Sequence, residues 1–79
     1  MHHTGTIDRR RVDSEGIRSV GYDEANWVLQ VERADGKVYN YYRVPPEDYA
    51  KLAKAPSADN WLRREIQRYY ESDEAVAEA

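Results

Sequence analysis

The chain has 79 residues, a formal net charge of −3 and charged side chains at 34% of its positions. A chain of this length forms one small domain, which buries only roughly 60% of the surface exposed by the unfolded chain. The absence of cysteine excludes disulfide stabilisation and thiolate chemistry, so packing must supply the stability.

The negative charge is concentrated at the carboxyl end, where four of the 15 acidic residues lie between positions 71 and 79. Without these four, the 12 lysines and arginines outnumber the acids by one. Such a balance neither requires nor excludes a nucleic acid partner.

No apolar run approaches the ~18 residues of a membrane span, and the amino end lacks the apolar stretch of a secretory signal. We therefore expect a cytoplasmic protein with no membrane partner.

Both ends are expected to lie outside the folded domain, which we assign to residues 12–70. Residues 1–11 carry one isolated apolar residue, Ile7, and end in three consecutive arginines. This is too little apolar surface to offset the entropy of ordering a packed element, so we predict a flexible arm that supplies an anion clamp. Residues 71–79 are interpreted as an acidic tail.

Two strands are predicted after the arm. Residues 17–22 form a short candidate strand, and residues 27–32 form a clearer one. In the second, Trp27, Leu29 and Val31 occupy alternate positions, the period-2 pattern of a strand with one buried face.

The following turn at Asp35-Gly36 predicts a hairpin, because glycine accepts the positive φ that such turns require. A two-residue loop would place Val31 opposite Asn40, whereas a three-residue loop with a glycine bulge places Val31 opposite Tyr39. We favour the second register because it makes one continuous apolar face. That face consists of Trp27, Leu29, Val31, Tyr39 and Tyr41. The opposite face carries Val28, Val38 and Tyr42.

Two helices are predicted next. The first begins near Pro46, because Pro45-Pro46 cannot donate to a strand ladder and proline suits the first turn of a helix; Pro56 ends it. Ser57 is the predicted cap of the second helix. The inward stripes are Tyr49, Leu52 and Ala53 in the first helix, and Trp61, Leu62, Ile66 and Tyr69 or Tyr70 in the second. The expected fold is therefore α+β, in the order β-β-β-α-α, with a three-stranded antiparallel sheet and two helices packed on one face.

An ordered series of short motifs runs along residues 13–70. It comprises Gly21-Tyr22-Asp23, the glycine turn, Tyr39-x-Tyr41, Val44-Pro45, Tyr49-x-x-Leu52, Ala55-Pro56-Ser57 and Ile66. This series resembles the KTSC domain family, whose members occur as carboxyl-terminal appendages of some bacterial lysyl-tRNA synthetases and as small free-standing proteins of bacteria and phages. The resemblance implies an RNA-binding role. Two positions depart from the family pattern: Asp59 replaces a glycine and Arg63 an asparagine.

Catalytic chemistry is not indicated by any group of residues. The sequence shows no nucleophile with a base, no carboxylate pair in separated environments and no metal cluster, so we expect no enzyme activity, cofactor or metal site. The adjacent His2 and His3 predict at most weak adventitious metal binding. The four glycines are scattered, which argues against a phosphate-binding loop.

Candidate ligand-binding residues are exposed tyrosines beside arginines, since tyrosines can stack bases while arginines contact phosphates. They are Tyr22, Tyr42 and Arg43 near the sheet and Arg63, Arg64 and Arg68 on the second helix. The competing interpretation is structural. A chain without phenylalanine must build its core from tyrosine and tryptophan, and mixed charges are typical of an ordinary solvated helix face.

Three functions follow as hypotheses. The first is a non-enzymatic RNA- or nucleic-acid-binding accessory domain. The second is a protein-interaction or homo-oligomerisation module that uses Val28, Val38 and Tyr42 on the uncovered sheet face. The third is a phage-type accessory protein that sequesters a small nucleotide between subunits.

Overall fold

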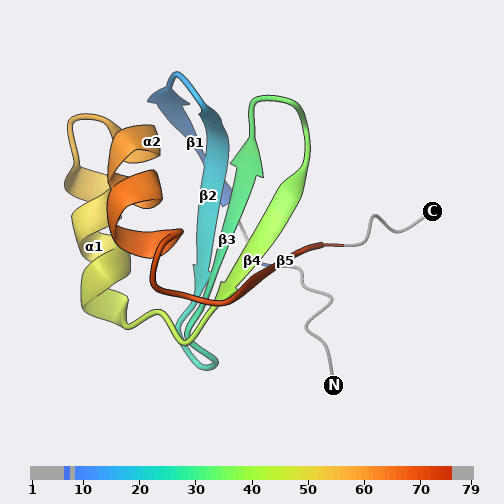
Figure 1. The fold of residues 1–79 in the computed structure, drawn as a ribbon, viewed down its shortest axis with the longest axis vertical. Coiled ribbons are helices and arrows are strands. Elements are labelled where there is room, and N and C mark those ends of the chain that lie inside the picture. Colours follow the sequence, from blue (N-terminus) through green and yellow to red (C-terminus); the bar gives the residue numbers. More distant parts are fainter. Residues whose placement is uncertain (1–6, 8, 76–79) are drawn as a thin grey trace.

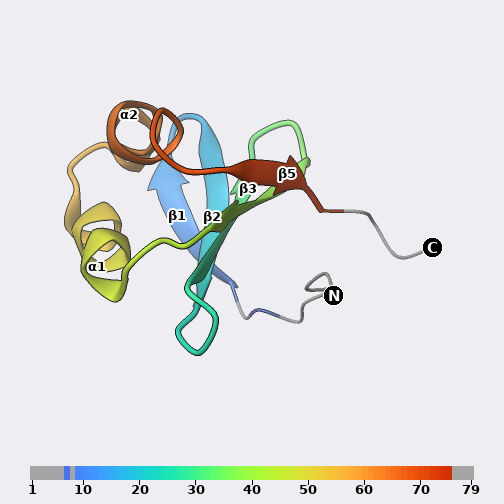
Figure 2. The same ribbon diagram turned by 60° about the horizontal axis from the view of Figure 1, so that its bottom comes forward.

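The computed structural model describes residue 7 and residues 9–75. Its centre is an antiparallel sheet in which neighbouring strands follow one another in chain order. The strands are β1 (Arg9–Ser14), β2 (Ile17–Asp23), β3 (Val28–Arg33), β4 (Val38–Tyr42) and β5 (Ser72–Glu74). The helices are α1 (Pro46–Lys54) and α2 (Ala58–Trp61), which continues directly into the π-helical segment η1 (Leu62–Ile66). The helices lie on one face of the sheet (Figures 1 and 2).

The predicted α+β architecture is confirmed, but the prediction of three strands was wrong, because the sheet formed by the described residues has five. β1 includes the three arginines assigned to a flexible arm, and β5 lies within the predicted acidic tail. Neither strand has an alternating apolar pattern. Both are held mainly by backbone pairing, with Arg9 opposite Gly21 at one edge and Asn40 opposite Asp73 at the other. The parts of the arm and tail at residues 1–6, 8 and 76–79 lie outside the described residues.

The favoured register of the β3–β4 hairpin is confirmed. Val31 pairs with Tyr39, and Leu29 pairs with Tyr41. Gly36 closes the loop with a φ of 90°, and its N–H donates to the Arg33 carbonyl at 2.9 Å. The left-handed conformation of Gly36 therefore sets the pairing that directs Tyr41 into the core, where it is 3% exposed.

The prediction that Trp27 belongs to the apolar face was wrong. The Asp23 carboxylate accepts hydrogen bonds from the backbone N–H groups of Ala25 and Asn26 and so closes a turn before β3. Trp27 leaves this turn with a φ of 56° and is 46% exposed. A non-glycine residue in this conformation is uncommon, because the left-handed region is sterically unfavourable for L-residues.

Both helices begin where expected. α1 starts at Pro46 and buries Leu52, while the Ser57 side chain caps α2 by accepting from the Asn60 N–H at 3.3 Å. η1 buries Leu62 and Ile66, as the predicted stripe requires. Of the two tyrosines that were left as alternatives, Tyr70 packs against the core and Tyr69 is 68% exposed.

The hydrophobic core lies between the sheet and the helices. It consists of Ile17, Val20, Leu29, Val31, Tyr41, Val44, Leu52, Ala58, Leu62 and Ile66. The family-pattern residues Val44, Leu52 and Ile66 are each at most 1% exposed, so they are core residues. Gly21 is also buried, in β2, and Tyr39 and Tyr49 pack against the core.

Candidate functional site

The sheet face opposite the helices carries a row of hydrogen-bonded polar side chains. Arg9 donates from Nε to the Ser19 hydroxyl at 3.0 Å and from Nη1 to the Gln30 side-chain carbonyl, Oε1, at 2.5 Å. Gln30 in turn donates to the Asn40 side-chain carbonyl at 2.9 Å, and the Ser19 hydroxyl donates to Glu32 at 2.9 Å. Gln30 and Asn40 are each 3% exposed. This row satisfies its own polar groups and fixes the position of Arg9.

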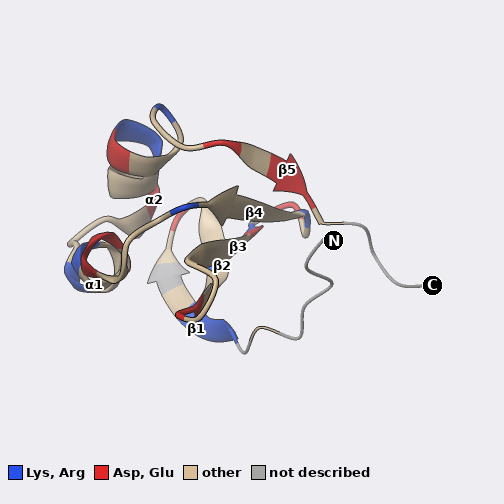
Figure 3. Ribbon diagram, turned by 90° about the horizontal axis from the view of Figure 1, so that it is seen from below, with Lys and Arg blue, Asp and Glu red and all other residues tan. Residues whose placement is uncertain are grey.

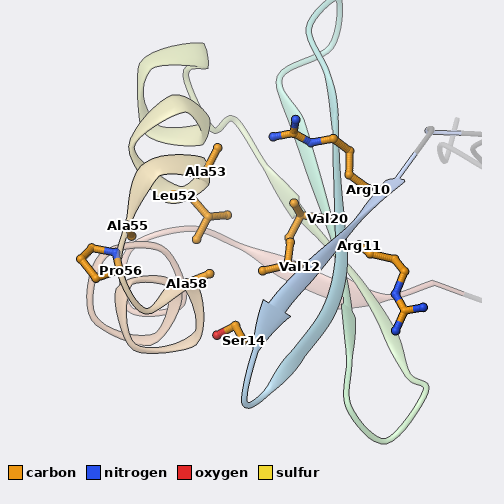
Figure 4. A pocket seen from close by; sticks show the side chains of 10 residues that line it. All are labelled: Arg10, Arg11, Val12, Ser14, Val20, Leu52, Ala53, Ala55, Pro56 and Ala58. Atoms are coloured by element: carbon orange, nitrogen blue, oxygen red, sulfur yellow. The ribbon is translucent and has the colours of Figure 1, made fainter.

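A cleft of about 270 Å³ opens between β1 and the helices. Its apolar wall is formed by Val12 and Val20 of the sheet, which point toward Leu52 and Ala58 of the helical layer (Figure 4). The Arg10 side chain extends on the same side of the sheet, whereas Arg11 points to the opposite side. The complete lining is Arg10, Arg11, Val12, Ser14, Val20, Leu52, Ala53, Ala55, Pro56 and Ala58.

The alternation of β1 places cationic groups on both faces of an edge strand. Arg9 and Arg11 pair with Gly21 and Ser19 of β2, while Arg10 pairs with Val20 and shares its face. All three arginines are exposed, and no acidic side chain among the described residues forms an ion pair with them. Figure 3 shows this basic strand at one edge of the sheet and the acidic β5 at the other. The cleft therefore combines an apolar wall with polar lining surface, and Arg10 stands at its rim.

Sequence reasoning missed this cleft because its arginines were assigned to a flexible arm. One signal was available in the sequence. Val12 is an apolar residue four positions before Gly16, and a short strand followed by a glycine turn into β2 would explain both residues. A single inward valine is too weak a pattern to identify an edge strand by periodicity.

The predicted candidate Tyr22 does not lie on the outer sheet face. It pairs with Leu29 on the helix side, stacks on Tyr49 with ring centroids 4.9 Å apart, and donates its hydroxyl proton to the Val44 carbonyl. Burial and the nearby carboxylate of Glu24 raise the pKa of Tyr22 to about 12. The prediction of an outward position was wrong, because β2 is in register with the apolar face of β3.

Tyr42 and Arg43 lie at the end of β4 nearest to α1. Tyr42 is on the outer face, as predicted, and donates its hydroxyl proton to Asp73 at 2.9 Å. Burial, followed by the hydrogen bond to Asp73, raises the pKa of Tyr42. Arg43 is exposed with a φ of 65°. It lies next to Trp27, because the Val44 N–H donates to the Trp27 carbonyl at 2.9 Å.

The three arginine candidates of the second helix are exposed but only partly free. Arg63 donates to the Asp59 carboxylate at 3.0 Å, and Arg64 lies 3.9 Å from the Glu65 carboxylate. The Arg68 guanidinium carbon lies 5.8 Å from the centroid of the Tyr69 ring. The charges of Arg63 and Arg64 are thus partly compensated, whereas Arg68 lies in the turn that follows η1 and not on the helix as predicted. None of the three lines the cleft beside β1.

Residue 7 and residues 9–75 contain no group of three or more histidine, cysteine, aspartate or glutamate side chains placed to hold a metal ion. His2 and His3 lie outside this part. None of the helices in the described part of the chain is long and apolar enough to cross a membrane.

Comparison with known proteins agrees with the fold and with the sequence motifs. The chain is 41% identical over 51 residues to an uncharacterised protein of Stutzerimonas stutzeri, covering 65% of this chain and 72% of the relative. A protein of Tsukamurella paurometabola is 37% identical over 51 residues, with 65% of this chain and 76% of the relative covered. The crystal structure of a KTSC domain protein from Yersinia pestis superposes with a TM-score of 0.85 at 24% identity, covering 91% of this chain and all of the other. The KTSC domain family model matches residues 13–70, and the chain therefore belongs to the KTSC domain family.

Proposed function

We propose that this protein is a non-enzymatic binding domain, and that it receives an anionic segment of a partner protein at the edge strand β1 and the cleft beside it. The observation that supports this proposal is the combination of three exposed arginines on β1 with a neighbouring cleft of mixed lining that has an apolar wall. A cleft of about 270 Å³ is slightly smaller than the roughly 300–1,000 Å³ of pockets for whole small ligands. It suits one or two side chains of a larger partner.

Nucleic-acid binding is the second candidate function, and exposed Trp27 beside exposed Arg43 favours it. Both residues adopt left-handed conformations, which are concentrated at functional sites in proteins. A base could stack on the indole while the guanidinium contacts a phosphate. The surrounding chain is acidic, however, with Glu24 in the adjacent turn and Asp73 beside Tyr42, which weakens the attraction for a polyanion. This charge pattern places nucleic acid second.

A charge-reversal experiment tests the proposal. Fluorescence anisotropy would measure binding of a labelled 20-residue polyglutamate and of a labelled 20-nucleotide polyuridine at ~50 mM salt, where contacts between ionic groups are strong. The variant is Arg10→Glu, and its matched control is Lys37→Glu in the β3–β4 loop, which changes the net charge equally at another exposed residue. Circular dichroism would establish that both variants are folded.

We expect Arg10→Glu to weaken polyglutamate binding at least tenfold and Lys37→Glu to change it less than twofold. Equal losses in the two variants would mean that only net charge matters, and would contradict a site at β1. Tight binding of polyuridine that is lost in Trp27→Ala and retained in Arg10→Glu would support the second candidate in its place.

A further inference from the structure

Among the described residues, one edge of the sheet has hydrogen-bonding groups without a partner strand next to the cleft. β1 pairs with β2 only, and no other described segment forms a backbone hydrogen bond with residues 9–14. In an antiparallel pair, alternate residues direct their N–H and C=O groups away from the partner strand. The Ser14 end is tied to α2, because its hydroxyl accepts from the Asp59 N–H at 3.2 Å. The open part of the edge is therefore the stretch from Arg9 to Val12.

The side chains of this stretch define what an added strand would meet. On the helix side, Arg10 stands at the rim of the cleft and Val12 in its wall. On the outer side, Arg9 lies across the sheet toward Ser19 and Gln30, whereas the exposed Arg11 side chain makes no such contact with another described residue. Since side chains alternate in an added strand as well, its residues would face the cleft and the outer side in turn. An aliphatic residue would reach Val12, and acidic residues would reach Arg10 and Arg11.

Charges on an edge strand usually serve to prevent further pairing. Here all three have the same sign, so they would repel a basic strand and attract an acidic one. A symmetric pairing of two β1 strands would bring six arginines together, which argues against a second copy joined through this edge. Charge complementarity points to a different, acidic partner.

The geometry points to strand addition: an extended acidic segment of another protein pairs with β1 as a sixth strand and places an aliphatic side chain in the cleft. This inference rests on the proposed function and specifies its binding mode. Main-chain hydrogen bonds to Arg9–Val12 supply general affinity, while the cleft and the arginines select the sequence. The sequence class is three consecutive acidic residues followed or preceded by valine, leucine or isoleucine, according to the direction of the added strand.

The test uses peptides in which every second backbone N–H is blocked by methylation, in two complementary sets. The probes are fluorescein-labelled Thr-Glu-Glu-Glu-Val-Thr and its reverse, to cover parallel and antiparallel addition. For the better binder, one analogue is N-methylated at its odd-numbered amides and another at its even-numbered amides. Because only one edge of an added strand faces β1, we expect one analogue to lose at least tenfold in affinity and the other to stay within about threefold. Amide hydrogen exchange in β1 should slow at alternate residues when the unmodified peptide binds.

The outcomes separate the binding mode from the proposed function. Binding that depends on Arg10 but survives both methylation patterns would overturn strand addition and leave an anion-binding cleft. Equal losses in the two analogues would also overturn it, because the effect would lie in the conformation of the free peptide. Failure of every acidic peptide, together with failure of polyglutamate, would overturn the proposed function itself. Peptide-independent self-association abolished by Arg10→Glu would identify a second copy as the occupant and contradict the assignment to another protein.

Discussion

Asp59 joins three parts of the fold through one buried carboxylate. It is 9% exposed and lies 3.0 Å from the Arg63 guanidinium and 3.2 Å from that of Arg33. The contact with Arg33 is an ion pair without hydrogen-bond geometry, since Asp59 Oδ1 accepts no hydrogen bond among the described residues. Because an uncompensated buried carboxylate is costly, Asp59 and Arg63 stabilise each other as a pair.

Gly16 leaves the room that the Asp59 carboxylate occupies. A Cβ atom on residue 16 would lie 2.6 Å from Asp59 Cγ, well inside contact distance. We predict that Gly16→Ala lowers the free energy of unfolding by about 1–3 kcal/mol, the usual cost of overpacking, measured by urea denaturation. The cost should shrink in an Asp59→Ala background, where the clash is absent. Equal costs in both backgrounds would show that backbone conformation, and not this contact, explains the glycine.

Two phenols make the stability of the protein sensitive to alkaline pH. Tyr70 donates its hydroxyl proton to Asp48 at 2.6 Å, and this bond raises the pKa of Tyr70 to about 12, with burial adding to the effect. The pKa of Tyr22 is also raised to about 12, chiefly by burial. An unfolded tyrosine titrates near pH ~10, so the folded state favours the protonated phenols. Their contribution is complete below about pH 10 and is lost as the pH rises toward about 12.

We predict that Tyr70→Phe lowers the free energy of unfolding by about 1 kcal/mol at neutral pH, because it removes a hydrogen bond. It should also flatten the decline in stability between about pH 10 and about pH 12, measured by urea denaturation at several pH values. Tyr69→Phe is the control, since Tyr69 is 68% exposed and makes no hydrogen bond through its hydroxyl among the described residues. If both variants keep the wild-type slope, the Tyr70–Asp48 bond is not the origin of the alkaline sensitivity.

At the scale of elements, the start of the helix formed by α2 and η1 is fixed by its N-cap residue, Ser57. Ser57 accepts from the Asn60 N–H, and its backbone carbonyl accepts from the Trp61 N–H at 3.0 Å. We predict that Ser57→Ala lowers the free energy of unfolding by about 1 kcal/mol. Ser57→Asp keeps an oxygen acceptor at this position, so its free energy of unfolding should stay close to that of the wild type. Urea denaturation of the two variants provides the measurement. A loss in Ser57→Asp equal to that in Ser57→Ala would contradict a capping role.

The elements that were predicted correctly have strong local signals. The β3–β4 register follows from the apolar alternation and from Gly36, and the helix starts follow from Pro46 and Ser57. β1 and β5 were missed because their side chains are mostly charged and exposed. β1 pairs along one edge with β2, and β5 pairs with β4, but the side chains of β1 and β5 carry no pattern that reports this pairing.

The candidate site was harder to predict for the same reason. The cleft exists only because β1 pairs with β2 and stands opposite the helices, so missing the strand meant missing the site. Among the predicted ligand residues, Arg64 lies on η1, Arg68 in the turn after it and Arg43 just after β4; all three are exposed, and none lines the cleft. Their proposed roles remain predictions, whereas the inward position of Tyr22 follows from a register that its own short strand did not reveal.

At the scale of the whole molecule, opposite charges occupy opposite edges of the sheet. Arg9, Arg10 and Arg11 lie along β1, while Asp73 and Glu74 lie on β5 (Figure 3). The molecule therefore carries a dipole across its strands although its net charge is small. An acidic partner would be oriented toward β1 before contact, and this steering would weaken as salt is added.

The order of the strands also predicts the sequence in which they fold. β1 to β4 are joined by short turns, so each strand can pair with the preceding one at little cost in loop-closure entropy. Such local pairing favours rapid folding. β5 is different, because both helices intervene between it and β4. We predict that β5 docks last and detaches first, so that amide exchange at Tyr42, which donates to the Glu71 carbonyl, is faster than exchange in β3. Equal protection from amide exchange at Tyr42 and in β3 would mean that the sheet opens only as a whole. Faster exchange at Tyr42 would mean that the acidic edge strand detaches while the rest of the domain stays folded.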